Sequence, residues 1–243
     1  MILNILYKEA LEKNSYLFES TELCEIMGRN KSDKGNIDLT KSHNYTTLYF
    51  NLFKDLKDKH LNIFELGLGT NNTDVRSNMG VFGRPGASLF GWSEFFPNSF
   101  IYGADIDSRI LFESDRIKTF YCDQTDPESI KKMWNNEILK EVKFDIIVED
   151  GLHALNAQIC FFENSIHKVK DGGYYIIEDF NHGESFNKMC NYFKGLQNSS
   201  IYHNLSVDIY QLPATSDRHK LNGNNSLVVI KKQNTFDIYE NHK

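Results

Sequence analysis

The sequence predicts an α/β fold: a Rossmann-like, seven-stranded, mostly parallel sheet with an antiparallel C-terminal hairpin. Between residues 62 and 177, short apolar stretches alternate with segments whose apolar residues recur at helical spacing. The stretch 144–149 contains three apolar residues in a row, which is typical of a strand covered on both faces. Stretches 207–212 and 226–230 have no helical segment between them, which predicts the hairpin at one edge of the sheet.

The composition fits one α/β domain with a small appendage. The chain has 243 residues, of which 40% are hydrophobic and 25% charged, enough for a sizeable core. The net charge of −6 disfavours a nucleic-acid partner, and no apolar run approaches the roughly 18 residues of a membrane span. The four cysteines are scattered and no signal peptide is evident, which predicts a cytoplasmic protein. Whether it forms a homo-oligomer is left open.

The first 43 residues are predicted to form a helical cap segment outside the sheet. Residues 3–27 mix apolar and charged positions at helical spacing, and a polar loop follows at 29–42. From residue 44 a helix begins, with Tyr45 and Tyr49 on its apolar face. We therefore expect a cap segment at 1–43, the main domain at 44–232 and a tail at 233–243.

The main domain opens with a strand at 62–66 that runs into a glycine turn. A long polar loop follows at 70–85, and a helix starts near Ala87 and ends before Pro97, which cannot continue it. Strands at 100–104 and 117–121 come next. The order strand, helix, strand predicts parallel pairing with right-handed crossovers.

The second half repeats this alternation. A helix is expected from Pro127, with Asp126 as its cap, before the strand at 144–149. The next helix is expected to carry apolar residues from Leu155 to Val169 on one face, and Gly172-Gly173 to stop it. A strand ending at Asp179 and a helix near residues 185–196 precede the hairpin.

Two neighbouring strands are predicted to end in acidic residues. Asp150 follows one strand, with His153 three residues later, and Glu178 and Asp179 end the next. Because parallel strands bring their carboxyl ends to the same sheet edge, these side chains should converge. Three hard oxygen ligands and one imidazole predict a divalent-metal site with a general base beside it. Any one of these acids alone could equally be a solvated strand end.

The glycine turn predicts a nucleotide-binding site. Glu65, Gly67 and Gly69 follow the first strand of the alternation. The dinucleotide fingerprint requires a third small residue where this chain has Asn72, so a nicotinamide is disfavoured. An adenosyl ligand without a pyrophosphate fits better. The alternative is that the glycines only make a tight turn.

A set of motifs between residues 32 and 179 resembles a known family. The motifs are Ser32–Gly35, His43–Thr46, Glu65–Gly69, Gly86–Leu89, Asp105–Asp107, Asp123–Asp126, Asp150–His153 and Ile177–Asp179. Taken in order, they resemble metal-dependent class I S-adenosylmethionine (SAM) methyltransferases that modify sugar hydroxyls, of the mycinamicin and macrocin type. These are similar in turn to a cephalosporin-biosynthesis methyltransferase-like family.

The resemblance implies a role for each matched residue. Magnesium or manganese would be held by Asp150, Glu178 and Asp179, and His153 would be the catalytic base. The residues implied at the SAM site are Lys34, His43, Tyr45, Glu65, Gly67, Gly69, Asp105, Asp123, Gln124 and Asp150. Within that set, Asp105 would bond the ribose, Asp123 and Gln124 would lie near adenine, and Lys34, His43 and Tyr45 would cover the methionine end.

The expected function is methyl transfer to a sugar hydroxyl, on a small-molecule glycoside, a nucleotide-linked sugar or a surface polysaccharide. Arg76 and Arg84 in the long loop are candidates for a phosphate contact. Two features have no counterpart in the family pattern: the length of the 70–85 loop and the segment Asn181–Gly183, which includes His182. A catechol or other vicinal diol, a nicotinamide-dependent oxidoreductase and a non-catalytic binding protein remain alternatives.

Overall fold

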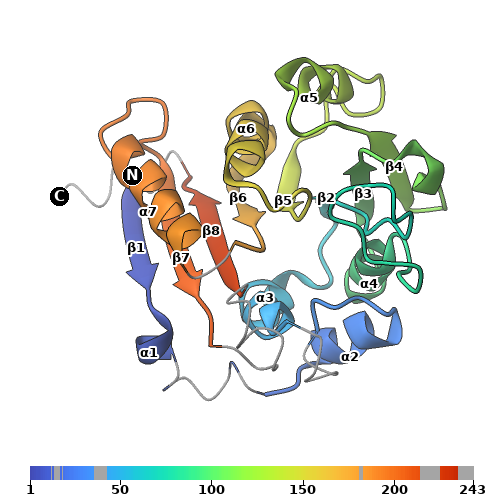
Figure 1. The fold of residues 1–243 in the computed structure, drawn as a ribbon, viewed down its shortest axis with the longest axis horizontal. Helices are drawn as coiled ribbons and strands as arrows, with labels where there is room; N and C mark the ends of the chain where they lie inside the picture. Colours follow the sequence, from blue (N-terminus) through green and yellow to red (C-terminus); the bar gives the residue numbers. More distant parts are fainter. Residues whose placement is uncertain are drawn as a thin grey trace.

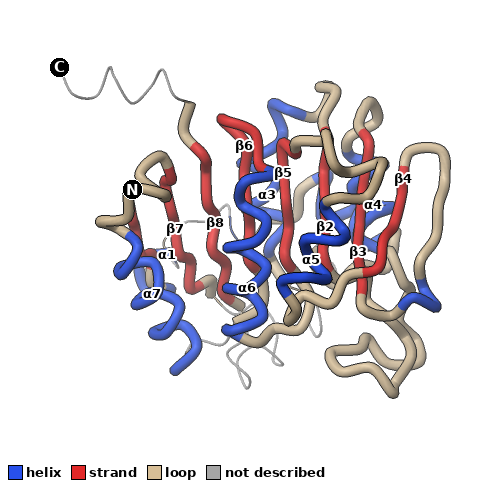
Figure 2. Tube along the Cα trace, turned by 90° about the horizontal axis from the view of Figure 1, so that it is seen from above, coloured by secondary structure: helices blue, strands red, loops and turns tan. Residues whose placement is uncertain are grey.

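The structure, a computed structural model, describes most of the chain in one mixed sheet covered by helices on both faces (Figures 1 and 2). The described residues are 1–11, 13, 17, 19–35, 43–180, 183–213 and 225–234. His182 and residues 235–243 of the expected tail lie outside them. Within these ranges, no helix has the length and apolar character that a membrane span requires.

Eight strands form the sheet in the described part of the chain. They are β1 (Ile2–Leu6), β2 (Asn62–Leu66), β3 (Phe100–Asp105), β4 (Ile117–Tyr121), β5 (Phe144–Glu149), β6 (Val169–Ile177), β7 (Leu205–Gln211) and β8 (Ser226–Lys232). Their order is β1-β7-β8-β6-β5-β2-β3-β4. Strand β8 is antiparallel to β6 and β7, and the other neighbours pair in parallel. The predicted Rossmann-like, mostly parallel sheet with an antiparallel C-terminal pair is confirmed.

Helices cover the two faces of the sheet in separate layers (Figure 2). They are α1 (Lys8–Leu11), α2 (Glu22–Arg29), α3 (Tyr45–Phe53), α4 (Ala87–Phe95), α5 (Pro127–Trp134), α6 (Leu155–Ser165) and α7 (Glu184–Leu196), with 3₁₀ turns η2 (Lys54–Leu56), η3 (Ser108–Ile110) and η4 (Ile166–Lys168). Apolar side chains of α5, α6 and α7 share one core cluster, and those of α2, α3 and α4 share the other. Each layer therefore buries one face of the sheet.

The expectation of helices alone before residue 27 was wrong at the start of the chain. Residues 2–6 form β1, which pairs in parallel with β7 at the sheet edge, with Leu3 opposite Val207. Leu3 and Ile5 pack partly buried against the core. Tertiary pairing thus overrides a weak local pattern. The sheet has eight strands rather than seven, and β1, not the C-terminal pair, forms that edge.

The expected boundary between α6 and β6 was also wrong. Helix α6 ends at Ser165, and Val169 is the first residue of β6 rather than a helix residue. Gly172 and Gly173 lie inside this strand, where Gly172 has a φ of +80° and the pairing with β5 is irregular. The glycine pair therefore makes a local irregularity in a strand, a second common use of glycine besides ending helices.

The strand order reverses beside β2. From β2 the chain adds β3 and β4 on one side, and then β5 and β6 on the other. In open α/β sheets a crevice forms at such a reversal, outside the carboxyl ends of the strands. The glycine turn after β2 and the acidic ends of β3, β5 and β6 all meet at this crevice.

Candidate active site

A cavity of about 900 Å³, counting the space open to solvent, lies at the carboxyl ends of the strands. The predicted site residues that line it are Lys34, His43, Gly67, Gly69, Asp105, Asp123, Gln124, Asp150, His153, Glu178 and Asp179. Tyr45 and Glu65 are buried and contact other residues of the site instead. A concave site lined by both apolar and polar side chains is typical of small-molecule binding sites.

The turn after β2 requires glycine. Gly67 has a φ of +92°, and a Cβ on it would lie 1.9 Å from the carbonyl oxygen of Asp150. A Cβ on Gly151 would lie 1.8 Å from Oε1 of Gln124. The loops that follow β2 and β5 thus touch backbone to backbone, and this contact forms the floor of the cavity.

Asp105, at the end of β3, fixes the same turn from the other side. Its carboxylate accepts hydrogen bonds from the backbone N–H groups of Leu68 and Asp107, both at 2.8 Å. Burial raises the pKa of Asp105. Asn72, which stands where a dinucleotide site needs a small residue, donates to Asp107 at 2.7 Å. The long loop is thereby tied to the end of β3.

Gln124 braces the loop after β5. Its amide nitrogen donates to Glu149 at 2.9 Å, and its oxygen accepts the backbone N–H of Leu152 at 2.7 Å. The other carboxylate oxygen of Glu149 has no partner among the described residues, and burial raises the pKa of Glu149 to about 7. Asp123, next to Gln124 in the cavity wall, accepts a hydrogen bond from the backbone N–H of Thr125 at 2.9 Å.

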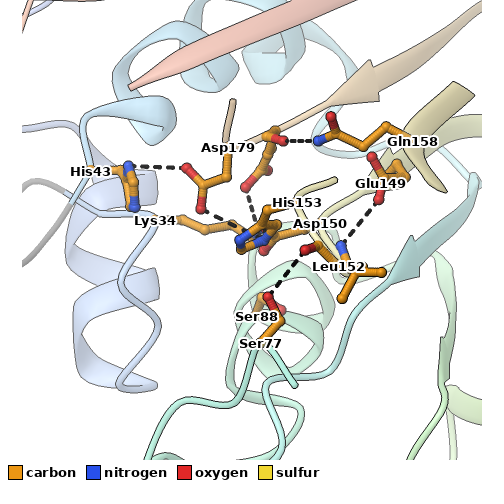
Figure 3. Close-up of polar contacts among 12 residues, drawn as sticks. Lys34, His43, Ser77, Ser88, Glu149, Asp150, Leu152, His153, Gln158 and Asp179 are labelled. Atoms are coloured by element: carbon orange, nitrogen blue, oxygen red, sulfur yellow. Dashed lines mark hydrogen bonds and ion pairs between the residues drawn. The ribbon is translucent and has the colours of Figure 1, made fainter. Parts of the chain in front are cut away.

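Lys34 lies among the carboxylates, with only 2% of its side chain exposed (Figure 3). Its ammonium group hydrogen-bonds Asp150, lies 2.6 Å from Oε2 of Glu178 and lies 3.6 Å from Oε1 of Glu65. Burial alone would lower the pKa of Lys34, but Asp150, Glu178 and Glu65 hold it well above its usual value. Glu65 in turn accepts hydrogen bonds from Ser88 and Trp92.

His153 faces two acids at the cavity side of this cluster (Figure 3). Its Nε2 lies 3.1 Å from Oδ1 of Asp150 and 3.8 Å from Oδ2 of Asp179. Burial would lower the pKa of His153, but the two acids raise it to about 10. One ligand atom from each of the three side chains lies within 4.8 Å of the others. Two carboxylate oxygens and an imidazole nitrogen at this spacing fit a divalent cation.

Glu178 does not join that group of three. Its Oε2 faces Lys34, and its Oε1 accepts the Tyr49 hydroxyl at 2.6 Å. Tyr45 donates to Asp179 in the same way, and the ring of His43 stacks on Tyr45 at 4.4 Å. The structure therefore gathers Asp150 and Asp179 with His153 and keeps Glu178 apart from them, and the metal-ligand roles of Asp150, Glu178 and Asp179 all stay predictions.

Tyr49 is a site residue that the sequence reasoning assigned to the core. The available signal was its spacing from Tyr45, because residues four apart lie on one helical face. The two hydroxyls consequently reach adjacent acids, Glu178 and Asp179.

The long loop contributes Thr70, Val75, Arg76, Ser77 and Met79 to the cavity wall. Among the described residues, the exposed guanidinium of Arg76 has no partner. Arg84 is engaged, since it donates to the carbonyl of Asn30 at 3.2 Å and lies 4.8 Å from the Phe90 ring.

Comparison with solved structures defines the class of fold. MycE methyltransferase from the mycinamycin biosynthetic pathway, in complex with Mg, SAH and mycinamycin VI, matches with a TM-score of 0.65 and 23% identity over 89% of this chain and 56% of that chain. An O-methyltransferase from Bacillus cereus in complex with SAH matches with a TM-score of 0.53 and 13% identity, over 92% and 96% of the two chains. The chain therefore has the Rossmann-like fold of class I methyltransferases.

Comparison with curated protein sequences finds similarity to O-methyltransferases that act on glycosylated compounds. No protein-family model matches the chain. It is 30% identical over 159 residues to 8-demethyl-8-(2-methoxy-alpha-L-rhamnosyl)-tetracenomycin-C 3'-O-methyltransferase of Streptomyces olivaceus, covering 65% of this chain and 36% of that protein. It is 32% identical over 138 residues to mycinamicin VI 2''-O-methyltransferase of Micromonospora griseorubida, covering 56% and 31%.

These findings confirm the resemblance to macrolide-type sugar O-methyltransferases that the motifs indicate. The MycE structures hold Mg and SAH, the demethylated product of SAM, which agrees with the cofactors expected for this chain. The chain spans between 31% and 45% of the length of the curated relatives it matches.

Proposed function

We propose that the protein is a SAM-dependent, divalent-metal-dependent O-methyltransferase acting on a sugar hydroxyl. The observation that carries this proposal is the convergence of Asp150, His153 and Asp179 at the mouth of the glycine-turn cavity. The curated relatives support the acceptor class, because their names specify methyl transfer to sugar positions of glycosylated compounds.

The cavity wall supports an adenosyl cofactor. Gly67 and Gly69 allow a ligand to approach the backbone closely, and Asp105, which lines the cavity, is the proposed partner of the ribose. Asn72 is held by Asp107 beside the turn, so no third small residue opens the turn to a pyrophosphate. This favours SAM over a nicotinamide dinucleotide, the cofactor of the oxidoreductase alternative.

The charges of the cluster support a metal. Glu65, Asp150 and Glu178 lie within 4 Å of the Lys34 ammonium group, and Asp179 lies beside His153, so the acids of the cluster outnumber its cationic groups. Magnesium or manganese, bound by Asp150 and Asp179 with Glu178 as the further ligand implied by the resemblance, would act as a Lewis acid on an acceptor oxygen.

His153 is the proposed base for the acceptor hydroxyl. About a third of its side chain (34%) is exposed, and the ring lines the cavity. Its raised pKa follows from the charges of Asp150 and Asp179, so its action as a base requires that these charges be offset. The remaining contribution is positional: the walls hold the methyl donor and the acceptor oxygen in line.

Within the class of sugar acceptors, the proposed substrate is a nucleotide-linked sugar or a sugar destined for a surface polysaccharide. Arg76 supports an anionic acceptor, because it lines the cavity and its guanidinium has no partner among the residues that the structure describes, so it could meet a phosphate. A neutral glycoside is the first alternative, and a catechol, which offers the same adjacent oxygens, is the second.

An acceptor panel tests this assignment. Methyl transfer from radiolabelled SAM should occur with nucleotide-linked sugars, with free glycosides and catechols as comparisons. Arg76→Gln should reduce turnover of nucleotide-linked sugars roughly tenfold or more, the effect of losing one charge-assisted hydrogen bond. Arg84→Gln is the matched control and should leave that turnover unchanged. Turnover of catechols alone would exclude a sugar acceptor, and equal rates in the two variants would exclude a phosphate contact at Arg76.

A further inference from the structure

Lys34 places a buried positive charge inside the cluster of acids that is proposed to bind a divalent cation. Its ammonium group contacts Asp150 and lies 2.6 Å from Oε2 of Glu178. Both acids belong to the predicted metal-ligand set. Each therefore has one oxygen committed to a cation that the chain itself supplies.

The lysine comes from a different layer than the acids. The carboxylates follow strands of the sheet, whereas Lys34 lies in the segment between α2 and α3. Residues 32–35 of that segment are anchored: the N–H of Ser32 donates to the carbonyl of Met27 at 2.9 Å, and the carbonyl of Lys34 accepts the N–H of Thr46 at 3.2 Å. A Cβ on Gly35 would lie 3.0 Å from the carbonyl oxygen of Cys24, so the segment also packs tightly. The backbone around Lys34 is thus anchored by contacts outside the sheet.

The second carboxylate oxygens of Asp150 and Glu178 explain why Asp150 groups with His153 and Asp179 whereas Glu178 does not. Asp150 turns its second oxygen toward His153, and Glu178 gives its second oxygen to Tyr49. Within the described part of the chain, Asp150, His153 and Asp179 are the group that brings three possible ligand atoms together. Lys34 and Tyr49 between them occupy both oxygens of Glu178, which keeps this acid out of that group.

We propose that Lys34 competes with the divalent metal for Asp150 and Glu178 and so keeps the metal affinity of the site low. This inference rests on the proposed metal site. Two cations attracted to the same oxygens repel each other, and burial strengthens that repulsion because little solvent screens it. Without Lys34, a metal would be the cation that compensates Glu178, and Glu178 would be free to bind it.

The test is calorimetric titration of Mn²⁺ into the wild-type protein and into Lys34→Met, which keeps the length of the side chain but removes its charge. We expect roughly tenfold or tighter Mn²⁺ binding by Lys34→Met. We also expect a lower melting temperature without metal and a larger rise on adding Mn²⁺. Lys34→Arg, which retains the charge, should not gain affinity.

Lys168→Met is the matched control. Lys168 is also buried, at 3% exposed, but its ammonium group donates to the backbone carbonyls of Leu139 and Lys140, away from the acids. Its replacement should lower the melting temperature and leave Mn²⁺ affinity unchanged. A gain in affinity shared by both variants would show a general effect of losing a buried charge and would overturn the proposal.

The remaining outcomes separate this inference from the proposed function. If the wild type binds Mn²⁺ and Lys34→Met binds it no more tightly, the proposed competition by Lys34 is contradicted and the proposed metal site is not. If neither protein binds Mn²⁺, both the proposed metal site and the proposed competition by Lys34 are contradicted. If Lys34→Met is unfolded, recovery of its circular dichroism spectrum on adding Mn²⁺ supports the proposal, and failure to recover overturns it, because Lys34 is then a structural residue.

Discussion

At the residue scale, His153 combines a chemical role with an unusual backbone. Its φ of +57° is uncommon for a residue other than glycine, and its ring is held by Asp150 at 3.1 Å. Leu152, the residue before it, is fixed by Gln124. Such positions persist only where the surroundings enforce them, and they concentrate at functional sites.

We therefore predict that His153→Asn lowers turnover on the order of 10²–10⁴-fold while SAM affinity stays unchanged. Asparagine tolerates a positive φ, so the loop should keep its shape. Turnover and calorimetric SAM binding are measured together, with His203→Asn, an exposed position, as the control. A wild-type rate in His153→Asn would remove the histidine from the chemistry.

Single residues also show how far sequence reasoning reaches. Asp150, His153 and Asp179 could be placed together because each follows a recognisable strand or motif and parallel strands end at one edge. The hydrogen bond from Tyr49 to Glu178 could not, since a tyrosine on an apolar helix face fits the core equally well. Nor could the partners of Arg84, which depend on how α2 and α4 pack.

At the element scale, the glycine turn after β2 packs directly against the loop after β5 that carries Asp150 and His153. Gly67 and the carbonyl of Asp150 approach so closely that no side chain fits between them. A change in one loop must therefore move the other.

Gly67→Ala should destabilise the protein by about 1–3 kcal/mol or more and abolish SAM binding, because alanine adds both backbone strain and a clash. Gly195→Ala is the control, since a Cβ there meets nothing within 4 Å, in helix α7. It should be neutral or stabilise by about 0.5–1 kcal/mol. Thermal unfolding and calorimetry measure both variants; similar melting temperatures for the two would contradict the proposed turn geometry.

Elements differ in how well sequence predicts them. Strands β2 and β4 and the capped start of α5 carry strong local signals, and their predicted bounds agree with the structure. Strand β1 could not be predicted, because its pairing with β7 joins segments some 200 residues apart in the chain. The glycine pair of β6 was misread because its local signal is shared by helix ends and strand irregularities.

At the scale of the whole molecule, the site is assembled from two layers. The sheet supplies the acids and the glycine turn, and the layer of α2 and α3 supplies Lys34, Tyr45 and Tyr49. The folded arrangement thus gathers buried like charges, which is unfavourable unless cations offset them. Lys34 and His153 lie against these acids, and the proposed metal would add further positive charge.

The most direct test of the central claim is the rate of methyl transfer from SAM to the acceptors of the panel, measured with Mg²⁺, after chelation, and after Mg²⁺ is restored. We predict that chelation abolishes transfer and that Mg²⁺ restores it. Asp179→Asn should weaken the response to Mg²⁺, because it removes one proposed ligand charge. Full transfer in the presence of a chelator would contradict a metal-dependent methyltransferase.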